Sequence, residues 1–195
     1  MIQNIELIDF NKFISVNTAI VHSNNDLSIL SAIKAADLGL IKPIFIGNRD
    51  FIEIFLREKN ICTNAKIIDS PNEQKSAEIA CLLSKNNEVS LIVKGHMHSD
   101  TLMSEFIKQE YEMLIKGSRL SHIWLLSFDD THKPIIVTDG ALNTNPSLKT
   151  KKQIIKNSIE FSKKLPNFNP KVAIISASEK IITNNPIKNV IKRSF

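Results

Sequence analysis

Small, polar and charged residues follow the apolar segments that the sequence predicts as strands. They are Ser23, Gly47 with Asn48, Asp69, Lys94 with Gly95, Asp139 with Gly140, and Ser176. In open α/β sheets, ligands bind beyond the carboxyl ends of the strands. The helix N-termini at that edge offer free N–H groups and a positive dipole end, which favour anions. The pattern predicts a phosphate-binding edge, and the alternative for each residue is that it only caps a helix or turns the chain.

The elements that must position these residues follow an alternating pattern. From about residue 18 onward, short apolar runs rich in β-branched residues alternate with longer amphipathic stretches. This pattern predicts an α/β fold with a mostly parallel sheet and flanking helices. The predicted strands cover residues 18–22, 43–47, 65–69, 89–94 and 171–176. The predicted helices cover residues 27–38, 50–59, 71–85, 100–111 and 145–164.

Two local signals refine this pattern. Ser70-Pro71-Asn72-Glu73 combines a serine N-cap, a proline at the first helical position and a capping-box glutamate, so the third helix is expected to begin at Pro71. Residues 121–128 and 134–138 are apolar and are separated by a short polar stretch, which predicts a hairpin. We expect this antiparallel element to be added to the parallel sheet.

The composition is that of a globular protein. The chain has 195 residues, of which 43% are hydrophobic and 23% are charged. No apolar run approaches the ~20 residues of a membrane helix, and the acidic residues Glu6 and Asp9 argue against a secretory signal. Cys62 and Cys81 form no disulfide framework, so we expect both to be reduced. A cytoplasmic protein without a membrane partner is the resulting prediction.

The charge permits anionic partners. There are 25 Lys and Arg residues against 20 Asp and Glu residues, giving a net charge of +5. Phosphates, coenzyme A and nucleic acid are all compatible with that balance. The lysines lie along predicted helical faces, without interleaved aromatic residues or a nucleic-acid motif, which indicates a solvated surface. No nucleic-acid partner is predicted.

Four segments, in order, resemble one enzyme family. They are residues 35–47; Lys94-Gly-His-Met-His-Ser-Asp100; Arg119-Leu-Ser-His122 with Lys133-Pro134 and residues 138–143; and residues 170–177 with Glu179-Lys180. The second is similar to a Lys-Gly-x-x-His-Thr-Asp loop of the phosphate acetyl/butyryl transferases. The order of all four resembles that family, and most closely its phosphate butyryltransferases.

The resemblance implies an acyltransferase that moves an acyl group between coenzyme A and inorganic phosphate. Its substrates would be acyl-CoA and phosphate, its products acyl phosphate and CoA, and it would need no metal or organic cofactor beyond the CoA thioester substrate. The implied architecture is two-lobed, like that of isocitrate and isopropylmalate dehydrogenases, and the implied assembly is a homodimer. We expect one transferase-like region over residues 1–195, with lobes at 1–118 and 119–182 and a divergent tail at 183–195.

The resemblance also implies the site residues. Arg119 and Asp139 are the expected catalytic residues. Arg119 would hold phosphate or the thioester oxygen, since a guanidinium presents a rigid fork to oxyanions. The expected substrate-binding residues are Lys94, His98, Ser121, Asn143 and Ser176. The alternatives are that Arg119 pairs with a surface carboxylate, that Asp139 stabilises a turn and that Asn143 caps a nearby helix. We expect His122 to be a half-buried ring with its hydrogen bonds satisfied.

Two departures from the family bear on activity. Ser104 stands where the family usually has an arginine, and family chains continue well beyond the last predicted strand. The resemblance therefore predicts a C-terminally truncated protein in which closing strands of the first lobe are missing. We expect this chain alone to have little or no transferase activity, and a separately encoded C-terminal piece is a possible partner.

Two other functions stay open from the sequence. One is a non-catalytic remnant, or a subunit of a split enzyme, that still binds CoA or phosphate. The other is a metal-dependent hydrolase built on His96-x-His98-x-Asp100, because alternation along an extended segment would place both imidazoles on one side.

Overall fold

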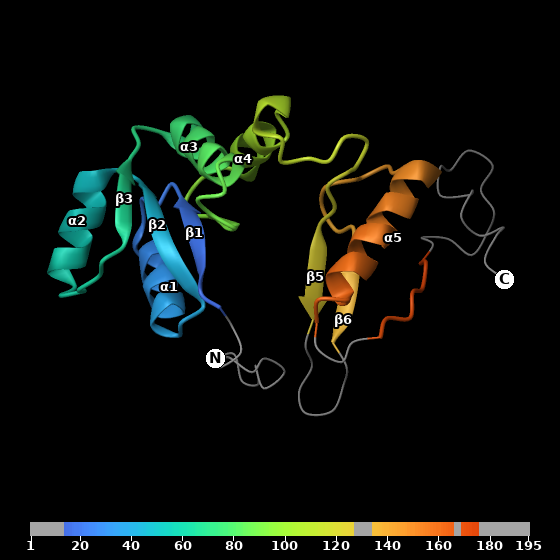
Figure 1. Ribbon diagram of the computed structural model, residues 1–195, viewed down its shortest axis with the longest axis horizontal. Coiled ribbons are helices and arrows are strands. Elements are labelled where there is room, and N and C mark those ends of the chain that lie inside the picture. Colours follow the sequence, from blue (N-terminus) through green and yellow to red (C-terminus); the bar gives the residue numbers. More distant parts are fainter. Residues whose placement is uncertain (1–13, 127–133, 166–168, 176–195) are drawn as a thin grey trace. The chain divides into compact units, whose positions relative to one another are not determined.

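The computed structural model describes residues 14–126, 134–165 and 169–175 (Figure 1). It divides into two compact units, and among the described residues the division falls between Ile115 and Lys116. Each unit is an independent arrangement of strands and helices, so each is described by itself. No helix within these ranges is both long and apolar enough to cross a membrane.

The first unit is built on a four-stranded parallel sheet. Its strands are β1 (Val16–Val21), β2 (Ile41–Gly47), β3 (Lys66–Asp69) and β4 (Leu91–Lys94), in the order β3-β2-β1-β4. All three strand pairings are parallel. The predicted α/β fold with a mostly parallel sheet and flanking helices is therefore confirmed.

Helices connect and cover these strands. They are α1 (Asp26–Asp37), α2 (Arg49–Glu58), α3 (Glu73–Lys85) and α4 (Ser99–Phe106), followed by the short 3₁₀ helix η2 (Gln109–Tyr111). Successive side chains of a strand point to opposite faces of a sheet. On one face Ile20 and Phe45 pack with α1 and α2. On the other face Ala19, Val21 and Ile46 pack with α3 and α4. The core therefore has two layers, one on each side of the sheet.

Asparagine N-caps fix where the helices begin. The side chain of Asn72 accepts a hydrogen bond from Lys75 N at 2.9 Å, so α3 begins at Glu73 and the expected start at Pro71 is wrong. The serine at position 70 is buried instead, and its hydroxyl accepts a hydrogen bond from Ser76 Oγ at 2.9 Å. An asparagine side chain close to the free N–H groups displaces the serine as the cap.

The second unit contains β5 (Ile123–Leu126), β6 (Ile135–Thr138) and α5 (Leu148–Ser162). The two strands pair antiparallel, which confirms the predicted hairpin strands, while residues 127–133 lie outside the described ranges. They form a sheet of their own among the described residues, so the expected addition to the parallel sheet is wrong. Helix α5 packs against β6 and begins after Ser147 rather than at Asn145, because the Ser147 side chain accepts from Thr150 N.

The predicted strand at residues 171–176 is absent from its described part, residues 171–175. Val172, Ile174 and Ile175 are exposed, and no described strand pairs with them. A strand requires a neighbour for its backbone N–H and C=O groups, so β propensity alone does not produce one.

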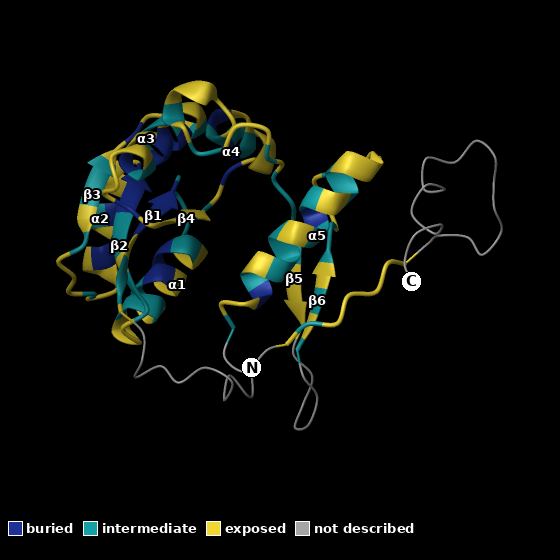
Figure 2. Ribbon diagram, turned by 45° about the vertical axis from the view of Figure 1, so that its right-hand side comes forward, coloured by how far each residue is buried: buried dark blue, intermediate teal, exposed yellow. Residues whose placement is uncertain are grey.

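Burial differs between the two units (Figure 2). In the first unit the sheet interior is fully buried, as at Ala19 and Phe45. In the second unit Trp124 and Val137 are directly opposite each other, as are Leu126 and Ile135, and all four side chains are exposed. These residues share one apolar face of the two-stranded sheet.

Candidate functional site

The segment that carries Arg119 is held against α5 by side-chain hydrogen bonds to its backbone. Gln153 Nε2 donates to Gly117 O at 2.6 Å, and Asn157 Nδ2 donates to Arg119 O at 2.8 Å. Gln153 and Asn157 are four residues apart, so they lie on the same face of the helix. The helix therefore fixes the backbone of residues 117–119 through the carbonyl groups. The Arg119 guanidinium takes no part in these two hydrogen bonds.

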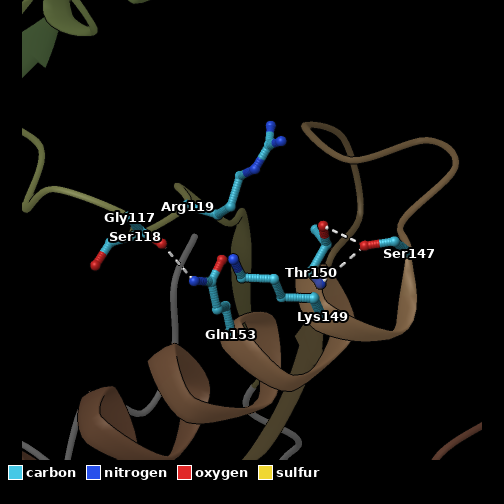
Figure 3. A pocket seen from close by; sticks show the side chains of 7 residues that line it. All are labelled: Gly117, Ser118, Arg119, Ser147, Lys149, Thr150 and Gln153. Carbon is cyan, nitrogen blue, oxygen red and sulfur yellow. Dashed lines mark hydrogen bonds between the residues drawn. The ribbon is translucent and has the colours of Figure 1, made fainter.

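A hollow of about 280 Å³ lies between this segment and the start of α5 (Figure 3). Its lining consists of Gly117, Ser118, Arg119, Ser147, Lys149, Thr150 and Gln153. Arg119 comes from the loop and Lys149 from the first turn of the helix, and both side chains are exposed. Ser147 Oγ accepts from Thr150 N at 3.2 Å and caps the helix. The first turn has no acidic residue.

This arrangement is suited to a small anion. A guanidinium, an ammonium and the positive end of a helix dipole all favour negative charge. The volume is at the lower end of the range for ligand sites, so the hollow suits a phosphate-sized group rather than a whole nucleotide. Both cations are open to solvent and can reach a solute directly.

Asp139 is engaged within its own loop. Its Oδ1 accepts from Ala141 N at 3.0 Å and from Leu142 N at 2.9 Å, and its Oδ2 accepts from Asn143 Nδ2. Burial by itself would raise the pKa of Asp139, but these hydrogen bonds outweigh burial and hold the pKa below its ordinary value. This geometry is that of a carboxylate that stabilises a turn.

Asn143 links the Asp139 loop to the Arg119 segment, and Ser121 links that segment to α5. Asn143 Nδ2 donates to Leu120 O at 2.9 Å, and the Ser121 hydroxyl accepts from Asn157 Nδ2 at 3.0 Å. Four of the predicted site residues are thus brought into one hydrogen-bonded group: Arg119, Ser121, Asp139 and Asn143. Ser176 lies outside the described residues.

His122, next to this group, differs from expectation. The ring is half-buried and packs edge-on against Trp124, with 4.9 Å between the ring centroids. Its Nδ1 is buried and has no hydrogen-bond partner in the described part of the chain, so the expected satisfied ring is wrong.

Lys94 and His98 belong to the first unit, at the carboxyl end of β4. The Lys94 ammonium donates to Met97 O at 2.8 Å and to Gly95 O at 3.4 Å, which closes the loop after the strand. His98 Nδ1 lies 3.2 Å from a carboxylate oxygen of Glu73, and His98 N donates to the same oxygen at 3.0 Å. His98 is therefore held by a residue 25 positions earlier in the chain.

Other strand-end residues of this unit have structural contacts. Ser23 is buried and donates to Ile20 O at 2.8 Å, and Asp69 Oδ1 accepts from Arg49 N at 3.0 Å. Asn48 is the N-cap of α2. At Gly95, an added Cβ would lie 2.6 Å from Val21 O, so the backbones approach too closely for a side chain. These residues fit the capping and turning alternative.

The sequence interpretation missed the contributions of α5. Lys149, Thr150, Gln153 and Asn157 line the hollow or hold the Arg119 segment. The sequence predicts a helix start at residue 145, two residues before Ser147, and predicts that Lys149 lies on a solvated helical face. Ser147 followed three residues later by Thr150 was the available N-cap signal.

The alternative metal site has no further ligands in the described ranges. Within residues 14–126, 134–165 and 169–175, no group of three or more His, Cys, Asp or Glu side chains is placed to hold a metal ion. His98 faces Glu73 instead. No structural observation favours the metal-dependent hydrolase.

Comparisons with known proteins agree on one family. The family model described as "Phosphate acetyl/butaryl transferase" matches residues 59–192. A phosphate acetyltransferase of Rickettsia typhi is 33% identical over 173 residues, which cover 88% of this chain and 49% of the relative. A phosphate butyryltransferase of Clostridium acetobutylicum is 29% identical over 163 residues, covering 83% of this chain and 54% of the relative. The chain spans about half the length of these curated relatives.

Solved structures show the same fold. A branched-chain phosphotransacylase from Enterococcus faecalis V583 aligns with a TM-score of 0.70 at 22% identity, over 88% of this chain and 60% of the other. A phosphotransacetylase from Streptococcus pyogenes aligns with a TM-score of 0.69 at 15% identity, over 83% of this chain and 59% of the other.

Proposed function

Because this chain belongs to the phosphate acetyl/butyryl transferase family, we propose that it serves acyl transfer between coenzyme A and inorganic phosphate. In that reaction a phosphate oxygen attacks the thioester carbonyl, a C–O bond forms, the C–S bond breaks and CoA leaves. The observation that carries the proposal is the cationic hollow at Arg119, which suits the phosphate.

Phosphate recognition would rest on Arg119, Lys149 and the first turn of α5. The guanidinium offers two parallel N–H donors to an oxyanion, and Lys149 adds a point charge. Fixed donors of this kind stabilise the negative charge that develops on the phosphate and carbonyl oxygens. Gln153 and Asn157 support this role because they hold the backbone on either side of Ser118.

The remaining site residues are proposed by resemblance. Asp139 would be catalytic, and Lys94, His98, Ser121, Asn143 and Ser176 would bind substrate. The contacts of Asp139 also support a positioning role, since it orders the loop whose Asn143 donates to Leu120 O. The two-lobed dehydrogenase-like architecture, with lobes at 1–118 and 119–182, is part of the same proposal.

The proposed partners are acyl-CoA and phosphate, without a metal or organic cofactor. A homodimer or a separately encoded C-terminal piece as partner, and a cytoplasmic location, complete the proposal. Each comes from the family resemblance and the composition.

Calorimetry and a thiol-release assay test the proposed function together. Acetyl-CoA or butyryl-CoA is titrated into the chain, and thiol release from each is then followed with and without phosphate. Binding is expected for at least one acyl-CoA. Phosphate-dependent thiol release would identify an enzyme and contradict the expectation of little or no turnover. Binding without turnover would identify the non-catalytic alternative. Loss of both binding and turnover would contradict the proposal.

A further inference from the structure

The hollow beside α5 contains one amine nucleophile. Among the residues that line it, Lys149 is the only lysine, and none is a His, Asp or Glu that could deprotonate a neighbouring hydroxyl. Lys149 is exposed and lies in the first turn of the helix. Its side chain extends toward Gln153 and the loop that carries Arg119 (Figure 3). Lys149 is therefore the strongest nucleophile that the lining offers.

Most of the other polar side chains in the hollow are engaged or cannot attack a carbonyl. Ser147 Oγ accepts from Thr150 N at 3.2 Å and lies 3.0 Å from Thr150 Oγ1. Gln153 Nε2 donates to Gly117 O at 2.6 Å. A guanidinium stays charged and is a donor only, so Arg119 can orient an anion but cannot attack it. The residue that orients an anion here and the residue that can react with it are thus different.

We propose that Lys149 is a site of covalent acylation by an acyl phosphate, which the hollow holds through its phosphate group. This inference rests on the proposed function, in which acyl phosphate is a product. The acyl carbon is bonded to a phosphate oxygen, so phosphate held beside Arg119 brings the carbonyl close to the lining side chains. The neutral Lys149 amine attacks the carbonyl carbon and an N–C bond forms. The C–O bond then breaks, phosphate leaves with the bonding electrons, and the amine proton passes to solvent.

Other lysines of α5 provide a comparison within the same chain. Lys152 and Lys156 are exposed on this helix but do not line the hollow. If exposure alone governed the reaction, Lys149, Lys152 and Lys156 would be acylated at similar rates. Orientation of the acyl phosphate in the hollow raises its effective concentration at Lys149 only. Acylation would also convert the ammonium of Lys149 into a neutral amide and so remove one of the cations that favour phosphate.

Mass spectrometry of the full chain tests this assignment. The chain is treated with limiting acetyl phosphate at about pH 9, because an amine attacks only in its neutral form and the neutral fraction rises with pH. Lys149 is expected to be acetylated roughly tenfold faster than Lys152 or Lys156. Excess inorganic phosphate should remove this preference, and so should Arg119→Gln. Arg57→Gln, which removes the same charge from an exposed position on α2, should leave the preference unchanged.

A reagent without phosphate and a salt control complete the experiment. An uncharged aryl acetate should acetylate the three lysines at similar rates, and sodium chloride of equal ionic strength should not reproduce the effect of phosphate. Similar acetylation of the three lysines by acetyl phosphate overturns the proposal. So does a preference for Lys149 that persists in excess phosphate, in Arg119→Gln or with the aryl acetate, or that sodium chloride removes equally well. Selective, phosphate-sensitive acetylation of a chain that binds no acyl-CoA would count against the proposed function and leave the acylation site supported.

Discussion

Arg119 is positioned through its backbone rather than through an ion pair. Asn157 holds its carbonyl group, and within residues 14–126, 134–165 and 169–175 no carboxylate pairs with its guanidinium. The alternative of a surface salt bridge therefore finds no support in this part of the chain. The guanidinium is left available to an anion in the hollow.

Arg119→Gln is expected to weaken phosphate binding by roughly 10- to 100-fold. Hydrogen bonds to charged groups contribute about 1.5–3 kcal/mol, which corresponds to that range of affinity. Titration calorimetry with inorganic phosphate measures the change. Arg57→Gln, an exposed arginine at the end of α2, is the control that removes the same charge. Equal losses in both variants would mean that overall charge, not the hollow, attracts phosphate.

Gly95→Ala is expected to destabilise the fold by at least about 2 kcal/mol. Its Cβ would lie 2.6 Å from Val21 O and 2.8 Å from His22 O, and backbone atoms cannot easily move aside. Gly39→Ala is the comparison, because Gly39 has a positive φ of 72° but no atom within 4 Å of the added Cβ. That variant should cost only about 1 kcal/mol. Urea unfolding measures the free energy of unfolding of both variants. Equal losses in Gly95→Ala and Gly39→Ala would contradict the predicted clash at Gly95.

Some residues of the candidate site could be predicted from the sequence, and others could not. Arg119 stood out through its motif, and Asp139 through its place after a strand. The pairing of His98 with Glu73 joins residues far apart in the chain, and no local pattern encodes it. Lys149 required the correct helix start, because only then does it fall in the first turn beside the hollow.

At the scale of elements, a buried carboxylate joins α3, α4 and η2. Glu105 is fully buried and accepts from Gln74 Nε2 at 2.6 Å, Tyr111 Oη at 2.7 Å and Lys108 Nζ at 2.8 Å. Burial alone would raise the pKa of Glu105, but the hydrogen bonds from Lys108, Tyr111 and Gln74 outweigh it and the pKa lies below its ordinary value. The ionised form thus stabilises the packing of these helices.

The stability contributed by Glu105 should depend on pH. Because its pKa is lower in the folded state than in the unfolded state, the contribution is present above about pH 4.5 and is lost as the pH falls through the folded value. Glu105→Gln should cost about 1–3 kcal/mol at pH 7 and less in acid. Urea unfolding at both pH values measures this. The same change at exposed Glu160 should have little effect, and a pH-independent cost at Glu105 would contradict the assignment.

The start of α3 gives a second prediction at this scale. Asn72→Ala removes the side chain that accepts from Lys75 N and should cost about 1 kcal/mol. Asn86→Ala, at the other end of the helix, is the control and should cost less, since its amide makes only a 3.4 Å contact with Glu88. A larger loss from Asn86→Ala in urea unfolding would favour a different helix start.

The presence of a helix or strand was predictable where it depends on a local sequence pattern. Alternation of apolar runs identified β1 to β4 because buried parallel strands read as short β-branched segments. The cap of α3 was misassigned because serine and asparagine compete for the same free N–H groups. Residues 171–175 have strand composition but no described partner, and pairing is a long-range property that composition does not contain.

At the scale of the whole molecule, the sequence matches and the structural matches point to the same family, but this chain covers only part of each relative's length. The family model matches residues 59–192, and the chain spans about half the length of the curated relatives. Ordered motifs made the family predictable from the sequence. The described residues divide between Ile115 and Lys116, and this division reflects long-range packing within each unit.

Amide NMR spectra of the chain titrated with inorganic phosphate test the central claim most directly. If the hollow beside α5 holds the phosphate of the acyl-transfer reaction, the amides of Gly117, Ser118 and Thr150 should shift saturably, and Arg119→Gln should move saturation to roughly 10- to 100-fold higher phosphate concentration. Unchanged spectra, or shifts spread over the lysine-rich surface without saturation, would contradict the account.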